Sequence, residues 1–394
     1  MSDDFIFTSE TVTSGHPDKL CDQVSDAIVD HFLRQDPDAR IIAECAVSSG
    51  IMFISTHYAS VAKFDIPDVA RQVIRDVGYP HSEFDADACT ILTSFMDHTA
   101  TDYMPHDLDA MDDEALDKIF CRQQTSVFGY ACNQTPDLMP LPIWLSNRLA
   151  RTLDAQHVRR ELPYLLPDSE TQVGVEFRNG RPHRVHSITL VARQTESSAL
   201  GLQQFRDDLR YTVVEPVLKE VDVGVDKNTD IFINPAGART GGGPAIHSGL
   251  TGRKTSIDSY GGYSRQSGAA LSGKDPMRID RAGAYVARYA AKNVVAAGLA
   301  SECEVQLSYS IGNAGPVSLR VRTFGTGKLD DREIGGRLED AIDFRIGGMV
   351  RDLKLKKLSS RDGGFYQKLA VYGHMGRTDL EVPWEETDLA ASLV

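Results

Sequence analysis

The hydrophobic and polar positions of this chain follow the same order three times. Each copy begins with an amphipathic helical period, continues with two strand-like runs joined by a turn, and then returns to a helical period. The apolar stripe of the first helix consists of Leu20, Val24, Ala27, Ile28 and Phe32. In this first copy we predict a helix at 17–34, strands at 41–47 and 51–57, a helix at 67–77 and a strand near 89–94.

The second and third copies repeat this order. Asn179-Gly180, a dipeptide typical of tight hairpin turns, separates the two strands of the second copy. The second copy predicts a helix at 141–153, strands at 172–177 and 185–192, a helix at 202–218 and a strand at 230–233. The third predicts a helix at 278–297, strands at 304–311 and 317–323, and a helix near 335–344. Together they predict an α+β fold of three similar α/β subdomains in a pseudo-threefold arrangement.

Two segments interrupt the pattern. The stretch 102–117 is rich in carboxylates and has no steady period, so it is either a solvated acidic loop or a mobile lid. The stretch 237–273 is rich in Gly and Ser but also carries Arg253-Lys254, Ile257 and Tyr260, which favours a binding loop over a flexible linker. We therefore expect an N-terminal subdomain (1–101), a mobile acidic loop (102–119), a central subdomain (120–234) and a C-terminal subdomain (235–394).

The composition of the 394-residue chain is that of an ordinary globular protein, with 41% apolar and 25% charged residues. A formal net charge of -14 argues against nucleic acid as a partner, although local basic clusters can still bind a small polyanion. None of the 6 cysteines forms a C-x-x-C pair, which favours reduced thiols in a cytoplasmic protein over a zinc site or a disulfide framework. No run approaches the roughly 20 apolar residues of a membrane span.

Three loops combine glycine with basic and acidic residues. In Ser14-Gly15-His16-Pro17-Asp18-Lys19, Pro17 suits the first helical position, where free N–H groups attract an anion. Ser272-Gly273-Lys274-Asp275-Pro276 repeats this arrangement, followed by Arg278 and Asp280. Between them, Gly249-Leu250-Thr251-Gly252-Arg253-Lys254-Thr255 misses the P-loop spacing, because Arg253 separates glycine from lysine, but its amides and guanidinium suit phosphate. Each loop alone also fits a capped helix or surface charge, whereas together they predict a site for a metal-bound polyphosphate.

These loops resemble the signature loops of the S-adenosylmethionine synthetase family. The resemblance runs in unbroken order from Phe5 to about Trp384 and includes Phe232-Ile233-Asn234-Pro235, Asp258-Ser259-Tyr260-Gly261-Gly262 and Ala287-Arg288-Tyr289-Ala290-Ala291-Lys292-Asn293. It implies a homodimer or homotetramer with active sites at the dimer interface, two Mg²⁺ ions and one K⁺. It also implies the reaction: a thioether sulfur attacks C5′ of ATP, and the expelled tripolyphosphate is hydrolysed to pyrophosphate and phosphate.

The resemblance assigns a role to individual residues. The leaving group carries about four negative charges and sulfur needs no general base, so positioning and electrostatics would supply the catalysis. His16, Lys19 and Lys274 would be catalytic, with His16 donating to the leaving oxygen. ATP and its phosphates would be bound by His16, Lys19, Asp168, Arg253, Lys254, Lys274 and Arg278. The metal ligands would be Asp18 and Asp280 for Mg²⁺ and Glu44 for K⁺.

The chain departs from the family in the acceptor and nucleoside pockets. His57 and His247 replace a glutamate and an aspartate that hold the methionine ammonium. Glu170 replaces an active-site lysine, and Gln123 replaces the aspartate of a Gly-rich nucleoside-binding turn. A single histidine would be a tolerated polar residue, but the loss of both acids from one sub-site predicts an acceptor pocket with changed preference.

Three functions are consistent with these features. The first is an ATP-dependent adenosyltransferase that forms S-adenosylmethionine, or a close sulfonium analogue, from ATP and a thioether amino acid such as L-methionine. The second is a family paralogue that uses a different acceptor or nucleotide. The third is a weakly active partner subunit, against which the retained His16, Asp18, Lys274 and Asp280 argue. For the enzyme we expect a cytoplasmic homo-oligomer with no nucleic-acid or membrane partner.

Overall fold

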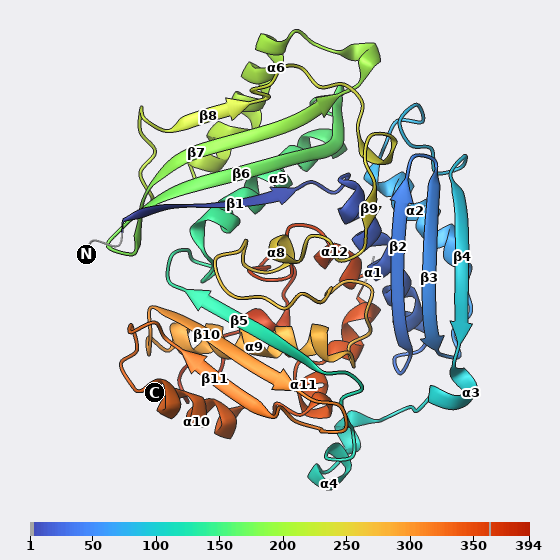
Figure 1. Ribbon diagram of the computed structural model, residues 1–394, viewed down its shortest axis with the longest axis vertical. Helices are drawn as coiled ribbons and strands as arrows, with labels where there is room; N and C mark the ends of the chain where they lie inside the picture. The colour runs from blue at the N-terminus through green and yellow to red at the C-terminus, as the bar shows by residue number, and fades with distance from the viewer. Residues whose placement is uncertain (1–3, 362–363) are drawn as a thin grey trace.

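Three β-sheets, each containing an antiparallel hairpin covered by helices, form the framework of the protein (Figure 1). The computed structural model describes residues 4–361 and 364–394. The three-subdomain α+β architecture predicted from the sequence is confirmed. No helix in the described ranges is both long enough and apolar enough to cross a membrane.

The N-terminal sheet has the strand order β4-β3-β2-β9. Along β2 the side chains of Ile41, Ala43 and Cys45 are buried, while Glu44 between them is exposed, as expected for a strand with one covered face. The strands are β2 (Arg40–Ser48), β3 (Ile51–Ala59), β4 (Thr90–Asp97) and β9 (Gly249–Leu250). The covering helices are α1 (Pro17–Gln35) and α2 (Ile66–Val77).

The central sheet has the strand order β1-β6-β7-β8. The predicted hairpin turn is confirmed, because Asn179 and Gly180 both have positive φ, 50° and 71°. The strands are β1 (Phe5–Val12), β6 (Leu165–Arg178), β7 (Arg181–Gln194) and β8 (Asp230–Ile233). The helices are α5 (Leu141–Val158), α6 (Leu202–Leu209) and α7 (Glu215–Leu218), with a π-helical turn at Arg210–Val214 between the last two.

The C-terminal sheet has the strand order β11-β10-β5. The helix that carries Ala287, α9, packs so closely on β5 that a Cβ on Gly129 would lie 1.9 Å from the Ala287 carbonyl carbon. Only glycine therefore fits at position 129. The strands are β5 (Thr125–Cys132), β10 (Glu302–Tyr309) and β11 (Ser318–Arg322). The helices are α9 (Ile279–Ala296), α10 (Asp331–Ala341), α11 (Ile346–Asp352) and α12 (Tyr366–Leu369).

Each sheet includes one strand from a distant part of the chain. In Figure 1 the blue β1 lies beside the green β6, the teal β5 beside the orange β10, and the yellow β9 beside the blue β2. The sequence pattern missed all three of these strands. These three strands position segments of the site. The loop before α1 follows β1, the loop 251–254 follows β9, and the residues 122–124 precede β5.

The acidic loop lies against basic residues of the C-terminal segment. It follows the short helix α3 (Thr99–Asp102), with which it shares Asp102, and it contains the short helix α4 (Asp113–Leu116). Arg345 pairs with Asp113 at 2.6 Å and with Asp117 at 3.0 Å, and Lys357 pairs with Asp109 at 2.5 Å. Its mobility as a lid stays a prediction.

Candidate active site

The loop between β1 and α1 is held on several sides before the helix begins. Ser14 donates its N–H to Asp154 at 2.8 Å, and Gly15 donates to the Pro167 carbonyl at 3.1 Å. The Tyr79 hydroxyl in turn donates to the Gly15 carbonyl. Gly15 permits this approach, because a Cβ there would lie 2.5 Å from the Pro167 Cβ. These contacts therefore fix the backbone from which the His16 side chain extends.

His16 caps α1 and is buried. Its Nδ1 accepts the N–H of Asp18 at 3.1 Å, which assigns the proton of the neutral ring to Nε2. Burial lowers the pKa of His16 to about 4, against the charge of Asp168, which raises it. At neutral pH the ring is uncharged and its Nε2–H can donate a hydrogen bond.

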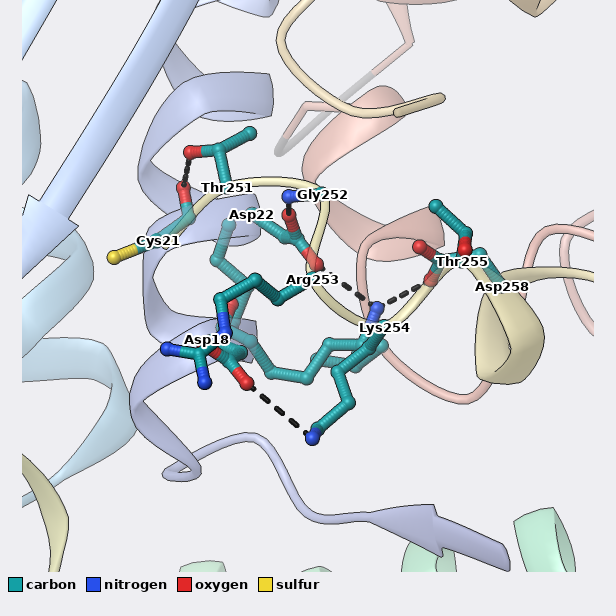
Figure 2. Close-up of polar contacts among 12 residues, drawn as sticks. Asp18, Cys21, Asp22, Thr251, Gly252, Arg253, Lys254, Thr255 and Asp258 are labelled. Carbon is teal, nitrogen blue, oxygen red and sulfur yellow. Dashed lines mark hydrogen bonds and ion pairs between the residues drawn. The ribbon is translucent and has the colours of Figure 1, made fainter. Parts of the chain in front are cut away.

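Asp18, in the first turn of α1, meets the loop that follows β9. One carboxylate oxygen accepts the N–H of Leu250 at 3.0 Å and lies 3.6 Å from Nε of Arg253. Figure 2 shows the Lys254 ammonium directed at the other oxygen, 3.3 Å away. The carboxylate is buried, whereas Arg253 is half exposed, so the positive groups border solvent. This is the arrangement expected where a polyanion approaches the start of a helix.

Lys19 points into the interior. Its ammonium has no exposed surface and pairs with Asp22 at 3.0 Å and with Asp258 at the end of α8 (Thr255–Asp258). Burial lowers the pKa of the Lys19 ammonium. The charges of Asp258 and Asp22 raise this pKa by more than burial lowers it, so the net pKa is above the ordinary value. The predicted catalytic and ATP-binding roles would require the ammonium to leave both carboxylates.

The start of α9 forms a second cluster. Lys274 pairs with Asp280 at 2.6 Å, and Asp280 also accepts a hydrogen bond from the side-chain amide of Gln123. The Gln123 carbonyl oxygen lies 3.4 Å from the Arg278 guanidinium that donates to it. Gln123, predicted in the acceptor pocket, thus lies beside a predicted Mg²⁺ ligand and a predicted phosphate-binding arginine.

Asp168 and His247 form a third group next to His16. One Asp168 oxygen accepts the N–H of Gly243 at 2.8 Å, lies 3.0 Å from Nε2 of His247 and 3.2 Å from Nε of Arg193. The rings of His16 and His247 are edge to face, 4.9 Å apart. Burial raises the pKa of Asp168, but the hydrogen bonds from His247 and Gly243 outweigh it, and the net pKa is lowered. His247 is therefore a partner of Asp168.

Three predicted site residues lie away from these clusters. Glu44 and His57 are on the outer face of the N-terminal sheet, in register with Ser55 and with Met96 respectively. Glu170 is exposed on β6, opposite Val12. The outward position of Glu44 follows from the alternation of side chains along a strand, because its neighbours Ala43 and Cys45 point to the buried face.

Sequence reasoning identified Asp18 but missed the stripe of buried carboxylates on α1 to which it belongs. Asp18, Asp22, Asp26 and Asp30 are all buried, and their spacing of four residues places them on one side of the helix. That spacing is visible in the sequence. Their partners come from distant segments: the amide of Gly252 for Asp22, Arg281 and the amide of Gly273 for Asp26, and Ser359 with the amide of Phe365 for Asp30.

Comparison with known proteins identifies the family of the chain. Residues 4–100 match the family model of the N-terminal domain of S-adenosylmethionine synthetase, residues 118–239 that of the central domain, and residues 241–386 that of the C-terminal domain. The fold and the three loop clusters thus define a three-domain protein of this kind, and the chain belongs to the S-adenosylmethionine synthetase family.

Individual relatives resemble the chain over its whole length. The S-adenosylmethionine synthase of Trichodesmium erythraeum is 43% identical over 98% of this chain and 96% of the relative. That of Trichormus variabilis is 44% identical over 99% and 96%, and that of Microcystis aeruginosa 44% over 100% and 98%.

Proposed function

We propose that the protein is an ATP-dependent transferase of the methionine adenosyltransferase type, which forms S-adenosylmethionine from ATP and L-methionine. The observation that carries this proposal is the assembly of neutral His16, buried Asp18 and the basic pair Arg253-Lys254 at the start of α1. The full-length similarity to proteins named S-adenosylmethionine synthase supports it.

The residues present suit the departure of a polyphosphate. The methionine sulfur supplies its own lone pair, so the protein has to orient the reactants and neutralise the charge that develops on the leaving oxygen. The Nε2–H of His16 is our proposed donor to that oxygen. Arg253, Lys254, Lys274 and Arg278 are our proposed phosphate contacts, and Asp168 our proposed contact to the nucleoside. The released tripolyphosphate would then be cleaved to pyrophosphate and phosphate.

The donor set fits Mg²⁺ that is held mainly by phosphate and water. No group of three or more His, Cys, Asp or Glu residues among those described is placed to enclose a metal ion. Asp18 and Asp280 each offer one buried carboxylate at a helix start, and Mg²⁺ is commonly bound by one or two carboxylates together with substrate phosphates. We therefore propose two Mg²⁺ ions, one at each aspartate, and K⁺ at Glu44. Bound there, Mg²⁺ would supply positive charge to the polyphosphate.

A different acceptor or nucleotide is not favoured. The relatives that match nearly the whole chain are named S-adenosylmethionine synthases. The prediction of a changed acceptor rested partly on His247, whose Nε2–H in the structure donates to the Asp168 carboxylate at 3.0 Å. Methionine is therefore the acceptor of this proposal.

A homodimer through the outer face of the N-terminal sheet is part of the proposal. Ile51, Phe53, Leu92 and Leu250 on this sheet are 52%, 43%, 51% and 45% exposed. Phe53 stands opposite Leu92 and Ala46, and Ala46 opposite Leu250, so an apolar row crosses the sheet. Such exposed apolar patches mark interaction sites, and a dimer here would bring Glu44 and His57 to a shared active site. A homotetramer and a cytoplasmic location stay predictions.

Product analysis tests the proposed function. The full-length protein is incubated with ATP, MgCl₂, KCl and L-methionine, and the products are identified by mass spectrometry. We expect S-adenosylmethionine, pyrophosphate and phosphate, and little product from Asp280→Asn. ATP consumption without a sulfonium product would reject the proposal. Light scattering on wild type and Phe53→Asp tests the dimer, which the charged residue should dissociate.

A further inference from the structure

Three arginines from separate elements gather beside the start of α9. Arg40 begins β2, Arg122 precedes β5, and Arg278 is the N-cap residue of α9. Arg40 Nη1 lies 3.9 Å and Arg278 Nε 3.8 Å from carboxylate oxygens of Asp275, and Arg122 Nη1 lies 3.7 Å from Asp102. Charge-assisted hydrogen bonds have lengths of about 2.7–2.9 Å, so these carboxylates approach the guanidiniums without hydrogen-bonding to them.

The Asp275 carboxylate hydrogen-bonds to backbone N–H groups and not to the arginines. It is buried, and its two oxygens accept the backbone N–H groups of Ile41 and Met277, each at 2.8 Å. The carboxylate therefore ties β2 to the segment before α9. The Arg40 side chain is 15% exposed, and its Nε is buried without a hydrogen-bond partner among the described residues. A buried donor of this kind calls for an acceptor.

The electrostatics agree with the distances. Burial lowers the pKa of the Arg40 guanidinium, and the charges of Arg122 and Arg278 lower it further, while Asp275 and Asp38 raise it. Asp38 is itself paired with Lys356 at 2.5 Å. The three arginines share two nearby carboxylates, Asp275 and Asp102, so the cluster keeps a net positive charge.

We propose that Arg40, Arg122 and Arg278 form a subsite for a phosphoryl anion beside the Lys274–Asp280 pair. Guanidinium groups present forked donors that match the oxygens of phosphate. Arg122 and Arg278 are 50% and 27% exposed, so the anion can enter from solvent, and Asp102 is itself 47% exposed on the acidic loop. The neutral Gln123 between Arg278 and Asp280 adds no competing charge. The anion is either free orthophosphate or the end of a bound tripolyphosphate, and only the second source rests on the proposed function.

Calorimetry on the full-length protein tests this subsite. Orthophosphate and tripolyphosphate are titrated separately, at constant ionic strength and without acceptor, into wild type, Arg122→Gln and Arg40→Gln. Arg181→Gln, an exposed arginine at the start of β7, removes the same charge elsewhere. We expect Arg122→Gln to weaken binding about tenfold or more, the scale of one charged hydrogen bond, and Arg181→Gln to change it by less than about twofold. Arg122 is half exposed, so its replacement tests the subsite even if Arg40→Gln does not fold.

Each outcome distinguishes the alternatives. Weaker orthophosphate binding in Arg122→Gln identifies free phosphate as the ligand, and weaker tripolyphosphate binding alone identifies the bound polyphosphate. Equal effects in Arg122→Gln and Arg181→Gln, no effect in either, or no anion binding by wild type would overturn the subsite. Because no turnover is needed, Arg122-dependent binding in a protein that makes no S-adenosylmethionine would keep the subsite and reject the proposed function.

Discussion

Helices α1 and α9 begin with similar sequences but use their lysines in opposite ways. Each start combines glycine, proline, lysine and aspartate, and each presents one buried carboxylate, Asp18 or Asp280, to basic groups. At α9 the motif's own Lys274 reaches the aspartate. At α1, Lys19 turns inward to Asp22 and Asp258, and the charges near Asp18 come from Arg253 and Lys254 on another segment.

The difference shows that a helix-start motif supplies an anion site without deciding which side chain completes it. Lys19 follows Asp18 on α1, where the helix is surrounded by protein and the buried Asp22 is one turn away. Lys274 precedes α9 at an isolated β-bridge to Ile42, and its side chain is 14% exposed. The surroundings of each helix therefore assign one lysine to stability and the other to a site open to solvent.

The largest expected effect separates the two lysines by stability. Lys19→Met should lower the free energy of unfolding by about 3–5 kcal/mol, because it leaves Asp22 and Asp258 buried without their cation. Lys274→Met should cost distinctly less, since Asp280 keeps the Gln123 amide as a donor. Urea denaturation followed by circular dichroism measures both. Equal losses would contradict the division of roles.

The second effect concerns the cap of α1. The folded pKa of His16 is about 4, below its ordinary value of 6.5, so between these values the unfolded chain binds more protons and stability rises with pH. The stability that His16 contributes should be fully present above pH 6.5 and should fall by about 2 kcal/mol as the pH drops to 4.5.

The difference in unfolding free energy between wild type and His16→Asn, measured from pH 4.5 to 7, isolates this contribution. Asparagine retains an N-cap acceptor and does not titrate. A difference that stays constant with pH would show that His16 is not held neutral by burial.

The third effect concerns phosphate binding at α9. Lys274→Ala should weaken Mg²⁺-dependent tripolyphosphate binding by about 1.5–3 kcal/mol, the value of a hydrogen bond to a charged group. Isothermal titration calorimetry measures it, with the exposed Lys227→Ala as the matched control. Unchanged binding in Lys274→Ala would assign this lysine to Asp280 alone.

The smallest effect concerns the acidic loop, which reaches the α9 side through Asp102 and Arg122. Arg345→Gln removes pairs to Asp113 and Asp117, but both aspartates are well exposed, so each pair is worth less than about 1 kcal/mol. We expect modestly faster proteolysis within 102–119, and faster cleavage in wild type at high salt. Substrates should protect the loop if it acts as a lid, and Arg332→Gln, exposed on α10, should leave cleavage unchanged.

Much of the fold could be predicted because its elements have clear periods and turn residues. The predicted helix at 17–34 is α1, and the predicted strands at 41–47 and 51–57 are β2 and β3. The strands β1, β5 and β9 were missed, since each pairs with a strand far away in the chain. β9 has only 2 residues, too few to show a period.

The sequence by itself determined the three-subdomain plan, the glycine-rich helix starts and the residue types that suit a polyphosphate, because these depend on local spacing. The direction of Lys19, the pairing of His247 with Asp168 and the gathering of Arg40 with Arg122 and Arg278 were decided only by the tertiary structure. Each depends on which distant segment lies alongside. Which segments lie side by side follows from the sheet topology, in which each sheet includes one strand from a distant part of the chain. This arrangement determines which buried charge has a partner close enough to pair with.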